Sequence, residues 1–142
     1  MSVLVKGGTI VTSTGRYVAD VYAEGDKIKS IGVDLDHPAD EVVDASGKYV
    51  LPGAIDPHTH ISMPFMGTSA QDDYKTGTIA AACGGVTTVV DFDLQQKGES
   101  LLEAIERKQS WAEGKVVVDY SLHPAVMDPR PEVIDEVKQA VL

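Results

Sequence analysis

The sequence predicts an α/β chain in two parts, a β-rich segment at residues 1–50 and alternating strands and helices at residues 51–142. In the first part, short apolar alternations are interrupted by glycine and aspartate, which is typical of strands joined by tight turns. In the second part, β-branched runs alternate with segments of helical periodicity. This order favours a parallel sheet covered by helices, as in an α/β barrel, over a mixed sheet.

Four short strands are expected in the β-rich segment, and they cover residues 3–5, 9–11, 19–23 and 27–31. Gly7-Gly8 separates the first two strands, and Gly25-Asp26 separates the last two. Consecutive strands joined by short turns form an antiparallel sheet. The polar stretch that follows, residues 34–40, predicts a loop, and one more short strand is expected after it.

Two histidines follow an apolar run at residues 49–55, which predicts a buried strand interrupted by Pro52-Gly53. Because side chains alternate along a strand, His58 and His60 share one face and together can bind one metal ion. Asp56 lies on the same face, where its carboxylate can orient an imidazole. The alternative is that these are hydrogen-bonded histidines of a core without any metal.

A helix and a buried strand are expected next. Ser69 or Asp72 can cap the helix, and Gly84-Gly85 can end it. The β-branched residues 86–91 fit a strand that is buried on both faces. Asp91 ends this strand, and a structural hydrogen bond is the role we expect for it.

A second helix begins with a capping box formed by Ser100 and Glu103 and continues to residue 111. Its periodicity places apolar residues on the core and leaves four charged side chains in solvent, namely Glu103, Glu106, Arg107 and Lys108. A third strand is expected at residues 116–120 and a last helix at residues 131–142. His123 follows that strand, either as a metal ligand or, as we favour, as a structural imidazole.

The composition is that of a soluble globular chain, with 43% hydrophobic and 24% charged residues. A formal net charge of −10 argues against nucleic acid as a partner. No apolar run approaches the roughly 18 to 20 residues that span a bilayer, and the start of the chain lacks a secretory signal, so we expect no membrane partner and a cytoplasmic location. The single cysteine, Cys83, is expected to be a small packing residue.

The octapeptide GAIDPHTH at residues 53–60 resembles the Gly-x-Ile-Asp-x-His-x-His signature of the amidohydrolase superfamily. Blocks further along the chain are similar to the cyclic amidohydrolases of the hydantoinase and dihydropyrimidinase type; they lie at residues 63–65, 76–78, 80–88, 90–92, 97–100 and 119–123.

The resemblance implies a fold of two domains. Residues 51–142 are implied to be the first β/α units of a (β/α)₈ metal-dependent hydrolase barrel, and residues 1–50 to be part of a β-sandwich. A complete barrel needs roughly 250 residues. We therefore expect the 142 residues to be an amino-terminal part of a longer chain.

The resemblance also implies an activity and its cofactors. The activity is the metal-dependent opening of a hydantoin or dihydropyrimidine ring to an N-carbamoyl amino acid. It implies two zinc ions per complete subunit, with manganese or another divalent metal as alternatives. His58 and His60 match half of one metal shell. The bridging lysine and the general-base aspartate have no match and are expected beyond Leu142, so the isolated chain is expected to be inactive.

In this family a loop at residues 61–68 borders the substrate pocket, which makes Met63, Phe65 and Met66 candidates for lining it. The alternative is that these side chains only cover the barrel mouth. An apolar loop suits a hydrophobic substituent better than a carboxylate, which disfavours a dihydroorotase. An allantoinase-like hydrolase and a non-catalytic fragment or assembly module remain the alternative functions. The resemblance further implies a homo-oligomer, commonly a tetramer.

Overall fold

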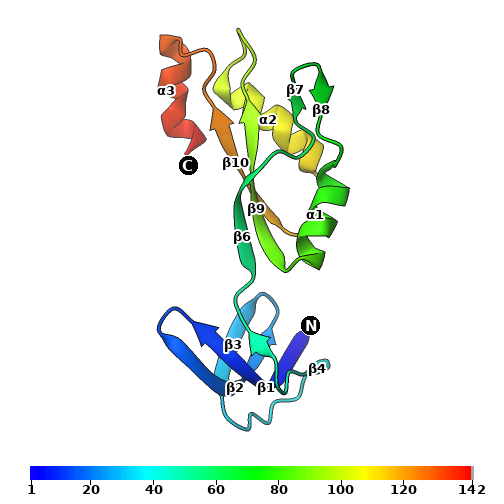
Figure 1. The fold of residues 1–142 in the computed structure, drawn as a ribbon. Helices are drawn as coiled ribbons and strands as arrows, with labels where there is room; N and C mark the ends of the chain where they lie inside the picture. The colour runs from blue at the N-terminus through cyan, green and yellow to red at the C-terminus, as the bar shows by residue number, and fades with distance from the viewer. Residues whose placement is uncertain (142) are drawn as a thin grey trace. The chain divides into compact units, whose positions relative to one another are not determined.

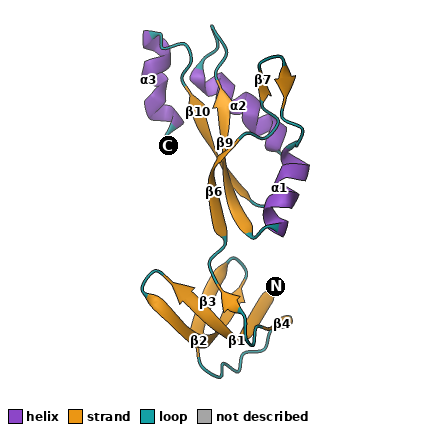
Figure 2. Ribbon diagram, viewed as in Figure 1, coloured by secondary structure: helices purple, strands orange, loops and turns teal. Residues whose placement is uncertain are grey.

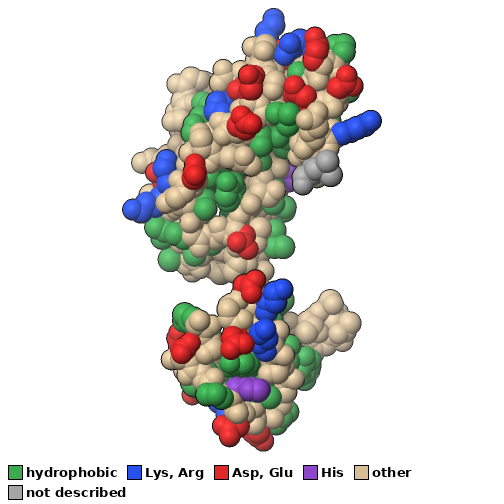
Figure 3. Space-filling model, turned by 180° about the vertical axis from the view of Figure 1, so that it is seen from behind, with side chains coloured by type: hydrophobic (Ala, Val, Ile, Leu, Met, Phe, Trp, Pro, Cys, Tyr) green, Lys and Arg blue, Asp and Glu red, His purple; other side chains and the backbone are tan. Residues whose placement is uncertain are grey.

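The computed structural model describes residues 1–141, and the chain divides into two compact units at Pro52 and Gly53 (Figure 1). Each unit has its own sheet. Among the described residues, no helix combines the length and the apolar character that crossing a membrane requires. Acidic, basic and hydrophobic side chains are interspersed on the face drawn in Figure 3.

The first unit is a five-stranded mixed sheet. β1 (Ser2–Thr12), β2 (Gly15–Glu24) and β3 (Lys27–Gly32) form the expected antiparallel meander. β4 (Glu41–Asp44) and β5 (Tyr49–Val50) both pair with β1 in parallel. The antiparallel meander is confirmed, and the further short strand expected after the loop is β4, which is parallel to β1 because the loop after β3 returns the chain to the free edge of β1.

The predicted break between two strands at Gly7-Gly8 is also wrong, since β1 continues through both glycines with a shift in register. Gly7 has a φ of 68°, which forms a bulge rather than a turn. Its N–H donates to Oδ1 of Asp20 over 2.7 Å. A Cβ on Gly8 would lie 2.4 Å from Cγ2 of Val50, so β5 packs directly against this glycine.

The second unit contains a three-stranded parallel sheet in the order β10–β9–β6. These strands are β6 (Ala54–Thr59), β9 (Val86–Leu94) and β10 (Asp119–Ala125). α1 (Tyr74–Cys83) connects β6 to β9, and α2 (Leu101–Ala112) connects β9 to β10. Both helices contact β9 (Figure 2). The predicted alternation of parallel strands and helices is confirmed.

The remaining elements of the second unit are a small hairpin and a third helix. β7 (Pro64–Phe65) and β8 (Thr68–Ser69) pair antiparallel where an irregular loop was expected. Met66 and Gly67 form the turn, with φ values of 49° and 82°. α3 (Pro131–Ala140) packs against α2.

Several predicted boundaries need correction. The apolar run at residues 49–55 is two strands, because β5 belongs to the first unit and β6 begins only at Ala54. The predicted strand at residues 116–120 is found three residues later, so His123 lies within β10 rather than after it. The last helix ends at Ala140, and Leu142 lies outside the described residues.

The helix caps explain where α1 and α2 begin. Asp73, and not Ser69 or Asp72, caps α1, with its carboxylate accepting from the N–H groups of Lys75 and Thr76. The predicted capping box of Ser100 and Glu103 opens α2 and is confirmed.

Candidate functional site

The imidazoles of His58 and His60 face each other at the carboxyl end of β6. Their Nε2 atoms lie 3.2 Å apart, and both residues are exposed. Two imidazole nitrogens at this separation are within hydrogen-bond distance of each other, and they are also close enough to bind one ion.

Simple strand alternation is not what brings the two rings together. Asp56 pairs with Val89 and Thr59 pairs with Asp91, so three steps along β6 match two along β9. The extra residue falls at Pro57-His58, where proline has no N–H to give to the ladder. The bulge therefore sets the direction of the His58 side chain.

Asp56 supports this bulge through the backbone. Its Oδ1 accepts a hydrogen bond from the N–H of His58 over 3.1 Å. This hydrogen bond involves the main chain of His58, whereas the expectation from sequence placed the Asp56 carboxylate against an imidazole.

Aromatic contacts surround the histidine pair. The Phe92 ring of β9 lies 4.4 Å from the His58 ring, 5.7 Å from the His60 ring and 5.2 Å from the His123 ring, between centroids. His123 therefore packs on Phe92. Within residues 1–141, no group of three or more histidine, cysteine, aspartate or glutamate side chains is arranged to hold a metal. The structure therefore leaves the metal-ligand role of His58 and His60 as a prediction from the sequence.

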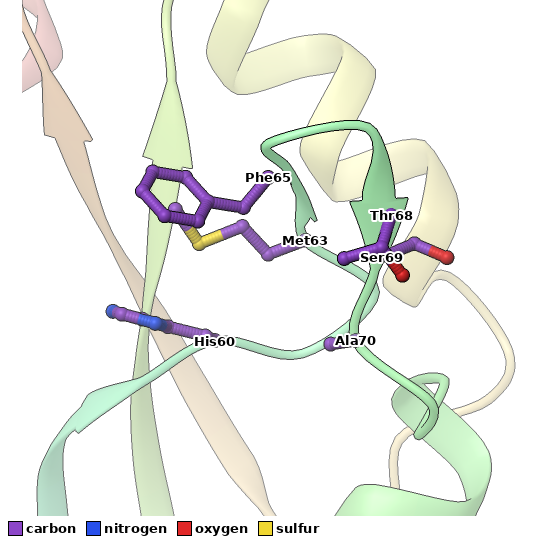
Figure 4. Close-up of a pocket in the computed structure, with 6 residues that line it drawn as sticks. All are labelled: His60, Met63, Phe65, Thr68, Ser69 and Ala70. Atoms are coloured by element: carbon purple, nitrogen blue, oxygen red, sulfur yellow. The ribbon is translucent and has the colours of Figure 1, made fainter.

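A cavity of about 290 Å³ adjoins the pair, and His60 is part of its wall. Its other lining residues come from the hairpin and the loops beside it: Met63, Phe65, Thr68, Ser69 and Ala70 (Figure 4). In Figure 4 the side chains of Met63 and Phe65 extend to the same side of the view as the His60 ring, and Thr68, Ser69 and Ala70 lie on the other side. Met66 is not among the lining residues and is 89% exposed at the tip of the hairpin.

Lys108 forms a buried ion pair with Asp91, so the expectation that Lys108 lies in solvent is wrong. Lys108 is 1% exposed, and its Nζ lies 2.9 Å from Oδ2 of Asp91, which is fully buried. The buried face of α2 consists of Leu101, Ala104, Lys108 and Ala112, which follow helical spacing. The lysine belongs to that stripe, although its charge suggested the opposite face.

Arg107 is also not in free solvent. It pairs with Glu99 at 2.9 Å and with Asp93 at 3.2 Å. The hydrogen bond from Arg107 lowers the pKa of Glu99. Burial raises the pKa of Asp93, and Arg107 opposes that rise. Oδ2 of Asp93 has no hydrogen-bond partner among residues 1–141.

Comparison with known proteins gives the family of this chain. Residues 49–141 match the Amidohydrolase family, and the chain therefore belongs to it. This confirms the resemblance first indicated by the octapeptide at residues 53–60.

Individual relatives show which members of the family this chain is similar to. The chain is 49% identical over 141 residues to D-hydantoinase of Geobacillus stearothermophilus, covering 99% of this chain and 30% of the relative. It is 46% identical over 140 residues to dihydropyrimidinase of Rattus norvegicus, covering 95% and 27%. The crystal structure of dihydropyrimidinase from Brevibacillus agri superimposes with a TM-score of 0.95 and 48% identity, covering 99% and 31%. The chain spans about 30% of the length of the relatives it matches.

Proposed function

We propose that the protein formed by this chain hydrolyses a cyclic amide, opening a hydantoin or dihydropyrimidine ring to an N-carbamoyl amino acid. The observation that carries the proposal is the pair of imidazole Nε2 atoms, 3.2 Å apart, beside a largely apolar cavity. The similarity to D-hydantoinase and dihydropyrimidinase over nearly the whole chain supports the substrate class.

The residues present fit a metal site of this kind. Both donors are imidazole nitrogens, the ligand type that zinc takes readily, and both are accessible. His58 and His60 would hold one of two zinc ions, or manganese or another divalent metal, and Asp56 would support the His58 backbone. When bound, the metals supply an activated water near neutral pH and polarise the amide carbonyl. The remaining ligands are not matched within residues 1–142.

The residues that line the cavity support the other proposed roles. Because His60 is part of the cavity wall, a ring bound there lies against the histidine pair. Met63 and Phe65 would hold an apolar exocyclic substituent and exclude water, while Thr68 and Ser69 can hydrogen-bond to polar ring atoms. Met66, at the exposed hairpin tip, would reach the ring only if the hairpin moved.

The wider architecture is part of the proposal. Three parallel strands joined through α1 and α2 support the start of a (β/α)₈ barrel, and the mixed sheet of residues 1–52 supports one part of a β-sandwich. The proposed homo-oligomer, in particular a tetramer, is based on the family resemblance, whereas the cytoplasmic location stays a prediction from the sequence.

A hydrolysis assay of the wild-type protein and of two histidine variants tests the proposal. The complete protein carrying this chain is incubated with dihydrouracil, with a 5-substituted hydantoin and with allantoin, and carbamoyl products are measured. We expect product from the first two substrates and its loss in His58→Ala and His60→Ala. Turnover of allantoin alone would favour the allantoinase-like alternative, and absence of any metal-dependent turnover would favour a non-catalytic module.

A further inference from the structure

A buried ion pair holds the segment that carries His60. Asp91 of β9 and Lys108 of α2 are both withdrawn from solvent. Burying two charges costs more than their mutual attraction returns unless further hydrogen bonds satisfy them. The partners of this pair therefore indicate what it does.

Two of those partners are the residues on either side of His60, Thr59 and Ile61. Oδ1 of Asp91 accepts from the hydroxyl of Thr59 over 3.0 Å and from the N–H of Ile61 over 2.8 Å. Nζ of Lys108 donates to the carbonyl of Ile61 over 2.6 Å. Both polar backbone groups of Ile61 are thus fixed by the ion pair.

Aromatic side chains complete the surroundings of the pair. The hydroxyl of Tyr74 donates to Oδ2 of Asp91 over 2.8 Å. Nζ of Lys108 lies 5.4 Å from the ring centroids of both Tyr74 and Trp111. Tyr74 has a hydrogen bond to the pair but none that the structure shows to residues 59–61, which makes it a matched control.

We propose that Asp91 and Lys108 are positioning residues for the metal site, fixing the backbone on both sides of His60 so that its imidazole faces His58 before a metal binds. This inference rests on the proposed function, because it takes the two histidines as ligands. A ligand held in place in advance loses less freedom on binding, and so binds more tightly. Without the ion pair, the exposed His60 segment would sample other directions.

The test is a Co²⁺ titration of the complete purified protein after removal of its metal, followed by visible absorption, which reports both affinity and ligand geometry. Three variants decide it: Thr59→Val, the double variant Asp91→Asn with Lys108→Met, and Tyr74→Phe as the control. Thr59→Val removes the hydrogen bond from the Thr59 hydroxyl to Asp91 and leaves the ion pair of Asp91 and Lys108 intact. The double variant removes both buried charges together, which avoids leaving one uncompensated.

We expect the double variant to bind Co²⁺ about 10- to 100-fold more weakly and with a changed spectrum, because loss of the hydrogen bonds that orient a metal ligand generally has this effect. Thr59→Val should show a smaller change in the same direction. Tyr74→Phe should keep the wild-type affinity and spectrum although it unfolds more easily.

The failure of each proposal has its own signature. Wild-type affinity and spectrum in Thr59→Val, with or without a folded double variant, would overturn the positioning role. Weakening by Tyr74→Phe as large as that by Thr59→Val would do the same, because it would indicate general destabilisation. Absence of Co²⁺ binding, or binding unchanged in His58→Ala and His60→Ala, would overturn the metal site itself.

Discussion

Two buried carboxylates, one in each unit, accept hydrogen bonds from irregular backbone, but the cations that pair with them differ in their exposure to water. Asp20 accepts from the N–H of Gly7 and from that of Leu35, and so joins the bulge of β1 to the following loop. Its cation, Lys6, is 4.0 Å away and half exposed. Asp91 instead has a fully buried cation 2.9 Å away. In both units a buried carboxylate accepts hydrogen bonds from the chain around it: Asp20 in the sheet of the first unit, and Asp91 in the segment around His60.

The burial of the cation therefore determines how strongly the fold is destabilised when that cation is removed from its carboxylate. Lys6 remains near water, which screens its charge, so its loss leaves Asp20 with its two backbone donors. Lys108 has no such solvent, and its loss leaves a charge uncompensated in the core.

Lys108→Met should destabilise the second unit by about 3 to 5 kcal/mol, since it breaks a buried ion pair from one side only. Urea unfolding followed by circular dichroism measures the loss. Lys6→Met is the matched control and should change the free energy of unfolding little. Equal effects of the two substitutions would contradict the contrast between the cations.

Tyr74→Phe should cost about 1.5 to 3 kcal/mol, because it removes one hydrogen bond to a charged, buried acceptor and leaves the ion pair intact. The urea midpoint measures this loss, with Tyr120→Phe as a control on a neighbouring ring. A cost above that of Lys108→Met would mean that the tyrosine, and not the lysine, satisfies Asp91.

Gly8→Ala should destabilise the first unit by about 1 to 3 kcal/mol, because the new Cβ meets Val50 at 2.4 Å and the core there must shift. Gly15→Ala is the control, since nothing lies within 4 Å of its Cβ position. Unfolding of both variants is compared with wild type. Equal stability of the two would contradict the close packing of β5 on the bulge.

Asp20→Asn should destabilise the protein in a pH-dependent way. Hydrogen bonds from Gly7 and Leu35, together with Lys6, lower the pKa of Asp20 below its usual value, although burial opposes them. A carboxylate with a depressed pKa stabilises the fold above its unfolded pKa, and this contribution is lost as the pH falls through the folded pKa.

The difference in unfolding free energy between wild type and Asp20→Asn should therefore be full at neutral pH. It should shrink as the pH falls below the unfolded value of roughly 3.9. Urea titrations between neutral and acidic pH measure it. A difference that grows on acidification would contradict the assignment.

Much of the fold could be predicted because its signals are local. The capping box at Ser100, the β-branched run of β9 and the glycines that end α1 each depend on residues near one another in sequence. The closeness of His58 and His60 was expected from their spacing, but the alternation used for that expectation is broken by the bulge between Asp56 and Thr59.

What the sequence could not show depends on distant partners. β1 continues through Gly7-Gly8 because Asp20 supplies an acceptor to the bulge. Lys108 is buried because Asp91, on another element, neutralises it. The helical spacing of Lys108 with Leu101 and Ala104 was a usable signal, but the residue type outweighed it in the prediction.

The most direct test of the central claim is the metal content of the complete protein by native mass spectrometry, for wild type and for His60→Ala. We predict two zinc ions per wild-type subunit and loss of at least one in the variant, with Gln71→Ala as an unchanged surface control. A subunit that carries no metal, or a His60→Ala variant with undiminished metal, would contradict the claim that His58 and His60 form part of a metal centre.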